Sequence, residues 1–258
     1  MKLSVKPQLL KYLILGAGGL GLILRIALYA TGTDEKGLLI TGHWANIALW
    51  ILTIAAAAAI FLFTRPIEGP ERYQDCYPVS LPGALGAFAA MIGIGAATIS
   101  EFAEFSSTIH LVVWILGLCA AISMGIIGFC RLTGGKPHFL LYAVVCIYFA
   151  LRMVSQYQLW SSDPQLMDYC FYLSAYVGLM LTAYHHAAFA ADMGKHRPLW
   201  FLTLVTVYLC CLSLKGTRDT LMMLTCGIWA FTNLTALSVP PRRPRPTLTL
   251  DADTPEES

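Results

Sequence analysis

The segment Leu22–Asn46, LILRIALYATGTDEKGLLITGHWAN, decides the fold class of this chain. Two apolar stretches flank a short polar turn, TGTDEKG, which is the pattern of a helical hairpin in a membrane. Arg25 lies inside the first apolar stretch, and His43 and Asn46 lie near the start of the second. Charged and polar groups are costly in lipid, so we expect these residues to have partners or a function.

The composition of the whole chain is that of a membrane protein. Of 258 residues, 57% are apolar and 12% are charged, whereas soluble domains average about 25% charged residues. Apolar runs long enough to cross a hydrocarbon core recur along the chain. We therefore predict an all-α, polytopic helix bundle in the cell membrane, with the lipid bilayer as its main partner. A net charge of +2, without any polar domain, argues against nucleic acid as a partner.

We expect eight transmembrane helices. Their predicted bounds are 9–30, 38–64, 81–100, 109–130, 138–160, 166–190, 199–215 and 220–239. The connections are short, so consecutive helices should be antiparallel neighbours. Small residues let helix backbones approach closely, and ladders of them predict that the first three spans are the tightly packed part. Residues 1–239 thus form one transmembrane bundle, and the Pro-rich, charged residues 240–258 form a disordered cytoplasmic tail.

The distribution of lysine and arginine predicts the orientation, because cytoplasmic connections carry the excess of these residues. With both termini in the cytoplasm, twelve fall on the inner side: Lys2, Lys6, Lys11, Arg65, Arg72, Arg131, Lys136, Lys195, Arg197, Arg242, Arg243 and Arg245. Three fall on the outer side: Lys36, Lys215 and Arg218. An even number of spans also places both termini on one side, so two independent features agree.

Charged or hydrogen-bonding residues occur near the outer ends of six spans, whereas the central and inner parts of these spans are almost wholly apolar in sequence. We infer an outward-facing polar chamber that binds or transports a small polar, anionic solute, because partly desolvated arginines hold carboxylates and phosphates strongly. The predicted ligand-binding residues are Arg25, Tyr29, His43, Asn46, Glu101, Glu104, Arg152, Gln156 and Asp168.

Other interpretations of the same residues stay open. Pairing of the arginines with the carboxylates is also what a purely structural membrane subunit of a larger complex would need. A membrane-embedded enzyme would use Glu101 and Glu104 with His43 or His110 as acid and base. Two layers of histidine are compatible with a haem-bearing redox protein. No catalytic or nucleotide-binding motif decides among them. Catalytic residues, cofactors and a homo-oligomeric or partner subunit are therefore left unassigned, and no metal ligands are predicted.

Overall fold

The computed structural model describes residues 7–32, 40, 42–69, 72–101, 108–160, 169–214 and 219–237. Within these residues the chain forms nine helices and no strand, which confirms the prediction of an all-α bundle. The helices are α1 (Pro7–Thr31), α2 (Trp44–Thr64), α3 (Tyr73–Cys76), α4 (Leu81–Glu101), α5 (Thr108–Thr133), α6 (Phe139–Trp160), α7 (Cys170–Ala190), α8 (His196–Leu212) and α9 (Thr220–Ala236).

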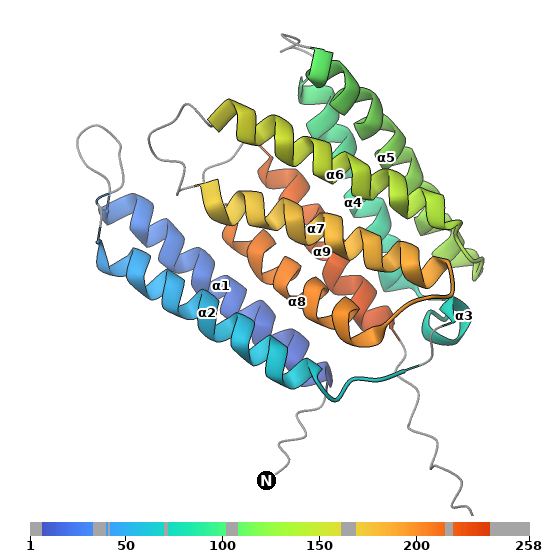
Figure 1. Cartoon of the computed structure of the whole chain (residues 1–258), viewed down its shortest axis with the longest axis horizontal. Coiled ribbons are helices and arrows are strands. Elements are labelled where there is room, and N and C mark those ends of the chain that lie inside the picture. The colour runs from blue at the N-terminus through green and yellow to red at the C-terminus, as the bar shows by residue number, and fades with distance from the viewer. Residues whose placement is uncertain are drawn as a thin grey trace, which may run out of the picture.

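All of these helices except the short α3 coincide with one predicted span each, and successive long helices run antiparallel (Figure 1). Helices α1, α4, α6 and α8 end at one side of the bundle, which is called the Asp219 end below. These four helices begin, and α9 ends, at the opposite side, which is called the Arg131 end below. Lys11 Nζ of α1 donates to the Leu234 carbonyl of α9 at 2.7 Å. The start of α1 and the end of α9 therefore lie on the same side of the bundle.

The closest helix packing is between α4 and α9. Gly86 and Gly93 of α4 lie so near Thr232 and Thr225 of α9 that a Cβ atom at either glycine would overlap the threonine side chain. Further packing follows the chain, with α4 on α5, α5 on α6, α6 on α7, α7 on α8, and α8 on α9. The α1–α2 hairpin packs on the outside of this group, against α8 (Figure 1).

The expectation of tight packing in the first three spans is right for α4 and wrong for α2. Ala55 and Ala58, in the alanine run of α2, are exposed. In α1, Gly18 and Gly21 lie against Cys211 and Leu212 of α8 rather than against α2. Alanine is apolar as well as small, so an alanine run is equally compatible with a surface that faces lipid.

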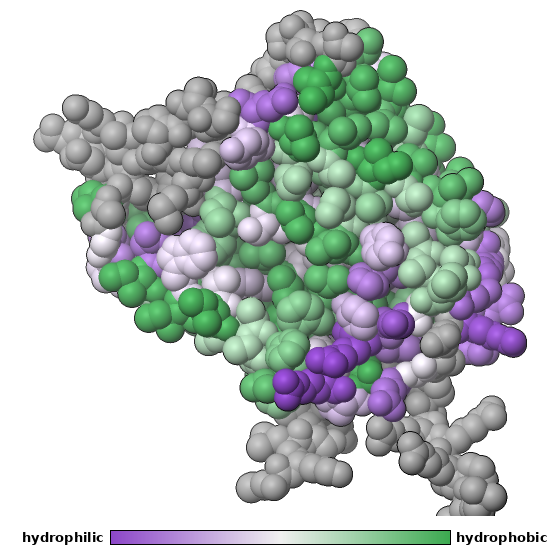
Figure 2. All heavy atoms as spheres, viewed as in Figure 1, coloured by the Kyte–Doolittle hydropathy of each residue, from purple (hydrophilic) through white to green (hydrophobic). Residues whose placement is uncertain are grey.

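Five helices are long and apolar enough to cross a membrane, namely α1, α2, α4, α5 and α6. Their surfaces expose large apolar side chains, including Ile54, Ile92 and Phe129, which a bilayer would cover. Figure 2 shows much of this apolar surface, with hydrophilic side chains gathered toward the Arg131 end. The protein is therefore a helical membrane bundle. That α7, α8 and α9 also cross the bilayer stays a prediction, because α8 and α9 have 17 residues each and α7 carries polar residues on buried faces.

Candidate functional site

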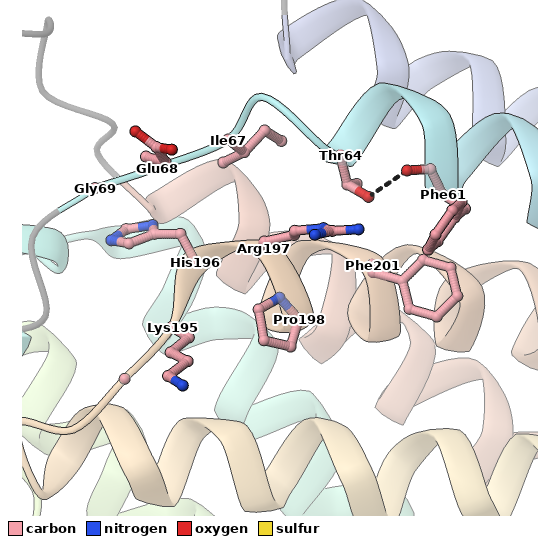
Figure 3. Close-up of a pocket in the computed structure, with 11 residues that line it drawn as sticks. Phe61, Thr64, Ile67, Glu68, Gly69, Lys195, His196, Arg197, Pro198 and Phe201 are labelled. Atoms are coloured by element: carbon pink, nitrogen blue, oxygen red, sulfur yellow. Dashed lines mark hydrogen bonds between the residues drawn. The ribbon is translucent and has the colours of Figure 1, made fainter.

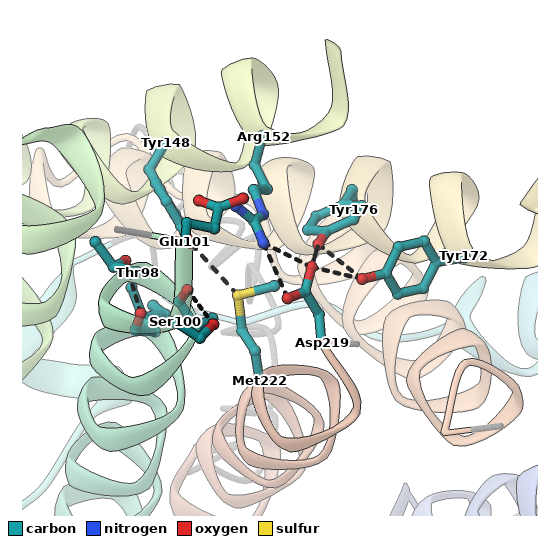
Figure 4. A network of polar contacts seen from close by, with 11 residues as sticks. Thr98, Ser100, Glu101, Tyr148, Arg152, Tyr172, Tyr176, Asp219 and Met222 are labelled. Atoms are coloured by element: carbon teal, nitrogen blue, oxygen red, sulfur yellow. Dashed lines mark hydrogen bonds and ion pairs between the residues drawn. The ribbon is translucent and has the colours of Figure 1, made fainter. Parts of the chain in front are cut away.

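A buried ion cluster lies at the Asp219 end, between α4, α6, α7 and α9 (Figure 4). Arg152 of α6 is 1% exposed, and its Nη2 donates to both carboxylate oxygens of Asp219, at 2.9 and 2.8 Å. Tyr172 and Tyr176 of α7 donate to Asp219 Oδ2 at 2.7 and 2.8 Å. Nη1 of Arg152 forms an ion pair with Glu101 at the end of α4. These residues are called the Asp219 cluster below.

Local structure explains how Asp219 enters the bundle. The residue directly precedes α9, a position where aspartate commonly caps a helix with its side chain. Asp219 makes no side-chain cap bond, because its carboxylate is turned inward to Arg152 and the two tyrosines. Tyr172 and Tyr176 lie one turn apart on α7, so both hydroxyls reach the same oxygen. These donors compensate the cost of burying the carboxylate.

The members of the cluster differ in access to solvent. The Glu101 side chain is 16% exposed, compared with 4% for Asp219 and 1% for Arg152. With these three side chains ionised, one positive and two negative charges give a net charge of −1. Among the described residues, Nε of Arg152 has no hydrogen-bond partner. The guanidinium is therefore held firmly at Nη2 by Asp219, whereas among the described residues Nη1 is paired with Glu101 and Nε makes no hydrogen bond.

Arg25 contacts the end of α8 and two aromatic rings. It is 3% exposed, and Nη1 donates to the Leu212 carbonyl at the end of α8 at 3.1 Å. Its guanidinium lies 5.8 Å from the ring centroid of Tyr29 and 5.6 Å from that of Phe171. The carbonyls at a helix C-terminus carry partial negative charge, so the end of α8 balances part of the charge of Arg25. The contacts named here and those named for Arg152 have no residue in common.

His43 and Asn46 lie at the start of α2. Nδ1 of His43 accepts from the Ala45 backbone N–H at 3.3 Å, so this histidine caps the helix. Asn46 is half-buried, and its backbone N–H donates to the His43 carbonyl at 3.0 Å. For His43, helix capping is the contact that the structure provides.

Gln156 is half-buried on α6, one turn beyond Arg152. Glu104 and Asp168 lie outside the described residues. Of the nine predicted site residues, the structure brings Glu101 and Arg152 into an ion pair and Tyr29 beside Arg25. A ligand-binding role for all nine stays a prediction.

A second buried arginine lies at the Arg131 end. Arg131, in the last turn of α5, is 2% exposed, and its guanidinium lies 3.8 Å from the ring centroid of Tyr77 and 5.3 Å from that of Tyr73. Nη2 donates to Asn233 Oδ1 of α9 at 2.8 Å. No carboxylate in the described part of the chain forms an ion pair with Arg131. The Arg131 cluster comprises these residues together with Tyr142 and His186.

This cluster adds buried polar contacts at the end of the bundle that the sequence predicts to be the inner one. A hydrogen bond of 3.2 Å links the Tyr77 hydroxyl and Nδ1 of His186 on α7. The His186 ring also stacks on Tyr142 of α6, with the centroids 5.5 Å apart. Helices α6, α7 and α9 therefore carry polar groups at both ends. In sequence, Arg131 stands near a span end and a Gly-Gly-Lys turn, where a solvated interface residue is the ordinary expectation.

The segment containing α3 is fixed over the Arg131 end by Asp192, in the turn after α7. Asp192 accepts from the Tyr73 backbone N–H at 3.0 Å and forms an ion pair with Lys136. These two donors, Lys136 first, lower the pKa of Asp192. Burial raises the pKa of Tyr73 and Tyr77 even though Arg131 is close, so both hydroxyls stay protonated at neutral pH.

Among the described residues, no group of three or more His, Cys, Asp and Glu side chains is placed to hold a metal ion. Comparisons of the chain with protein families, with curated proteins and with solved structures found no match. Function is therefore inferred from the geometry of the chain itself.

Proposed function

We propose that the protein spans the cell membrane eight times and binds, for transport, a small anionic solute that enters at the Asp219 end. The main support for this proposal is that Nη2 and Nη1 of Arg152 have partners that differ in burial. Buried Asp219 fixes Nη2, while Nη1 is paired with Glu101, the more exposed carboxylate. A guanidinium whose Nη2 is fixed and whose Nη1 is paired with a more exposed group is suited to the charge-assisted binding of a carboxylate or phosphate.

In this proposal the solute takes the place of Glu101. One of its oxygens would accept from Nη1 of Arg152, and the Glu101 side chain would swing toward the open end of α4. Asp219 would stay in place, because Tyr172 and Tyr176 hold it as well as Arg152. Gln156, one turn from Arg152, is a further donor on the same helix.

The replacement of Glu101 by the solute should be accompanied by uptake of a proton, because the charge of the cluster must stay balanced. The cluster has a net charge of −1 with Arg152, Asp219 and Glu101 ionised, and an added anion would make it −2. Uptake of one proton by the displaced Glu101 restores −1, and it removes a charge that would otherwise lie beside the solute. We therefore expect the solute to bind together with one proton.

The proposed orientation has both termini in the cytoplasm and the Asp219 end outside. It is supported by the excess of lysine and arginine at the Arg131 end. Among the described residues, that end has Lys11, Arg65, Arg72, Arg131, Lys136, Lys195 and Arg197. Labelling of single cysteines placed at Arg72 and at Glu35 in intact cells tests the orientation, because only the latter should react with an impermeant reagent.

The binding proposal is tested by thermal melting of the purified protein with a panel of small carboxylates, phosphate and sulfate at neutral and mildly acidic pH. We expect at least one anion to raise the melting temperature, and to do so more strongly at the lower pH. Arg152→Lys should reduce this increase, because lysine keeps the positive charge but lacks the planar set of guanidinium N–H donors. Glu101→Gln should keep the increase and remove its pH dependence. Lys136→Gln, which removes a cation at the other end, is the matched control.

If no anion stabilises the unmodified protein, and joint neutralisation of Arg152 and its carboxylates restores the stability lost on neutralising Arg152 alone, the cluster is a structural tie between helices and the proposal is wrong.

A further inference from the structure

A groove lies between the end of α2 and the start of α8, at the Arg131 end (Figure 3). Its volume is about 590 Å³, and its lining residues include Phe61 and Ile67 on the α2 side and Arg197 and Phe201 on the α8 side. None of these residues belongs to the Asp219 cluster or to the Arg131 cluster. The groove is therefore a separate feature of the molecule.

The rim of the groove is cationic. The guanidinium groups of Arg65 and Arg197 lie 4.9 and 5.5 Å from the ring centroid of Phe61. Both arginines are exposed, and neither forms an ion pair with a carboxylate of the described residues. Lys195 adds a third positive charge to the lining, against one negative charge from Glu68.

The start of α8 increases this positive character. Residues Lys195–Pro198 line the groove, and the helix begins at His196 without an acidic residue in its first turn. The first N–H groups of a helix carry partial positive charge and favour a bound anion. The helix terminus thus acts in the same direction as the two arginines.

Below the rim, the groove is apolar. The Phe61 and Phe201 rings meet edge to face, with centroids 6.1 Å apart, one turn or more inside their helices. Leu62, next along α2, is 57% exposed, on a helix apolar enough to cross a membrane. Charge at the rim and aromatic surface beneath it follow the same order as the phosphate and acyl chains of a phospholipid.

We propose that this groove binds an anionic phospholipid, with the lipid phosphate between Arg65 and Arg197 and an acyl chain along Phe61 and Phe201. Basic pockets between transmembrane helices on the cytoplasmic side bind anionic headgroups in this manner. A soluble anion would contact the two arginines but not the rings of Phe61 and Phe201 beneath them. The chemistry and the position at the edge of the apolar surface both favour the lipid.

The test uses the full-length protein in nanodiscs of phosphatidylcholine that contain a rising fraction of phosphatidylglycerol. Melting temperature and native mass spectrometry report binding. We expect phosphatidylglycerol to raise the melting temperature and to remain bound in the gas phase. The variant Arg65→Gln/Arg197→Gln should weaken the apparent affinity roughly 25-fold, since each basic residue near an anionic lipid surface contributes about a factor of five. Both arginines are exposed, so the variant should fold, and each single variant provides an intermediate point.

Lys136→Gln is the matched control, because it removes a cation from the same end but outside the groove, and it should bind as the unmodified protein does. Equal stabilisation by pure phosphatidylcholine would overturn the proposal. So would an undiminished response of the double variant, or an equal loss in the Lys136 control. Inorganic phosphate added to phosphatidylcholine nanodiscs should have no effect, and reproduction of the lipid effect by phosphate would show a soluble anion as the ligand instead.

Discussion

The two buried arginine clusters share helices α6, α7 and α9 and balance their charge in opposite ways. At the Asp219 end, Arg152 lies between two carboxylates, Asp219 and Glu101. At the Arg131 end, Arg131 lies against the Tyr77 ring and an amide oxygen of Asn233. Ionic compensation is strong but leaves a buried charge behind when one partner is lost. Compensation by π-systems and amides leaves none, so the two ends should tolerate change very differently.

The largest expected effect is the removal of the positive charge at the Asp219 end. Arg152→Met should lower the free energy of unfolding by about 3–5 kcal/mol, because Asp219 stays buried without its ionic partner. Arg152→Met/Asp219→Asn should recover most of that loss. Thermal melting of both variants in one detergent measures the difference, and a double variant as unstable as the single one would show that the pair is not the cause.

The same substitution at the other end should cost less. Arg131→Met loses one charge-assisted hydrogen bond and the stacking on Tyr77, for about 2 kcal/mol. Met fills a similar volume, and no carboxylate of the described residues is left unpaired. The comparison with Arg152→Met, under identical melting conditions, is the direct test. An equal or larger loss for Arg131→Met would contradict the distinction between the two clusters.

Two tyrosine variants test the same difference between the clusters, with smaller expected changes in stability. Tyr176→Phe removes a donor to buried Asp219 and should destabilise the protein by about 1–2 kcal/mol. Tyr142→Phe should have a smaller effect, because the buried Tyr142 hydroxyl lies near Arg131 and Tyr73 but meets neither at full hydrogen-bonding geometry. Chemical denaturation or melting of the two variants side by side gives the answer, and a marked loss for Tyr142→Phe would reveal an unrecognised partner.

The smallest expected effect is at the α3 segment. The pKa of Asp192 is lowered by Lys136 and the Tyr73 N–H. A carboxyl whose pKa is lower in the folded state stabilises the fold above its unfolded pKa, near 4, and loses this contribution as pH falls through the folded value. Asp192→Asn should therefore lower the melting temperature slightly at neutral pH, and the difference should vanish in acid. A difference that persists unchanged at low pH would assign it to the hydrogen bonds alone.

The sequence predicted what depends on local pattern. Apolar run lengths gave eight helices in the right places, and the similar depth inferred for Glu101 and Arg152 predicted that an arginine would meet a carboxylate. Asp219 escaped prediction because an aspartate before an apolar helix is typical of an N-cap, and its inward rotation depends on three residues from other helices. Arg131 escaped for the same reason, since its partners Tyr77 and Asn233 are distant in sequence and were not recognisable as partners from spacing.

The glycine contacts between α4 and α9 have a mechanical consequence. Gly86 and Gly93 seat against threonines so closely that sliding or rotation of either helix on the other would bring the two into collision. Glu101 is carried by α4, and Asp219 directly precedes α9. The two negative charges are thus carried by helices that are locked together, whereas Arg152 comes from a third helix, α6. A tilt of α6 relative to α4 and α9 would therefore strain both ion pairs of Arg152 at once.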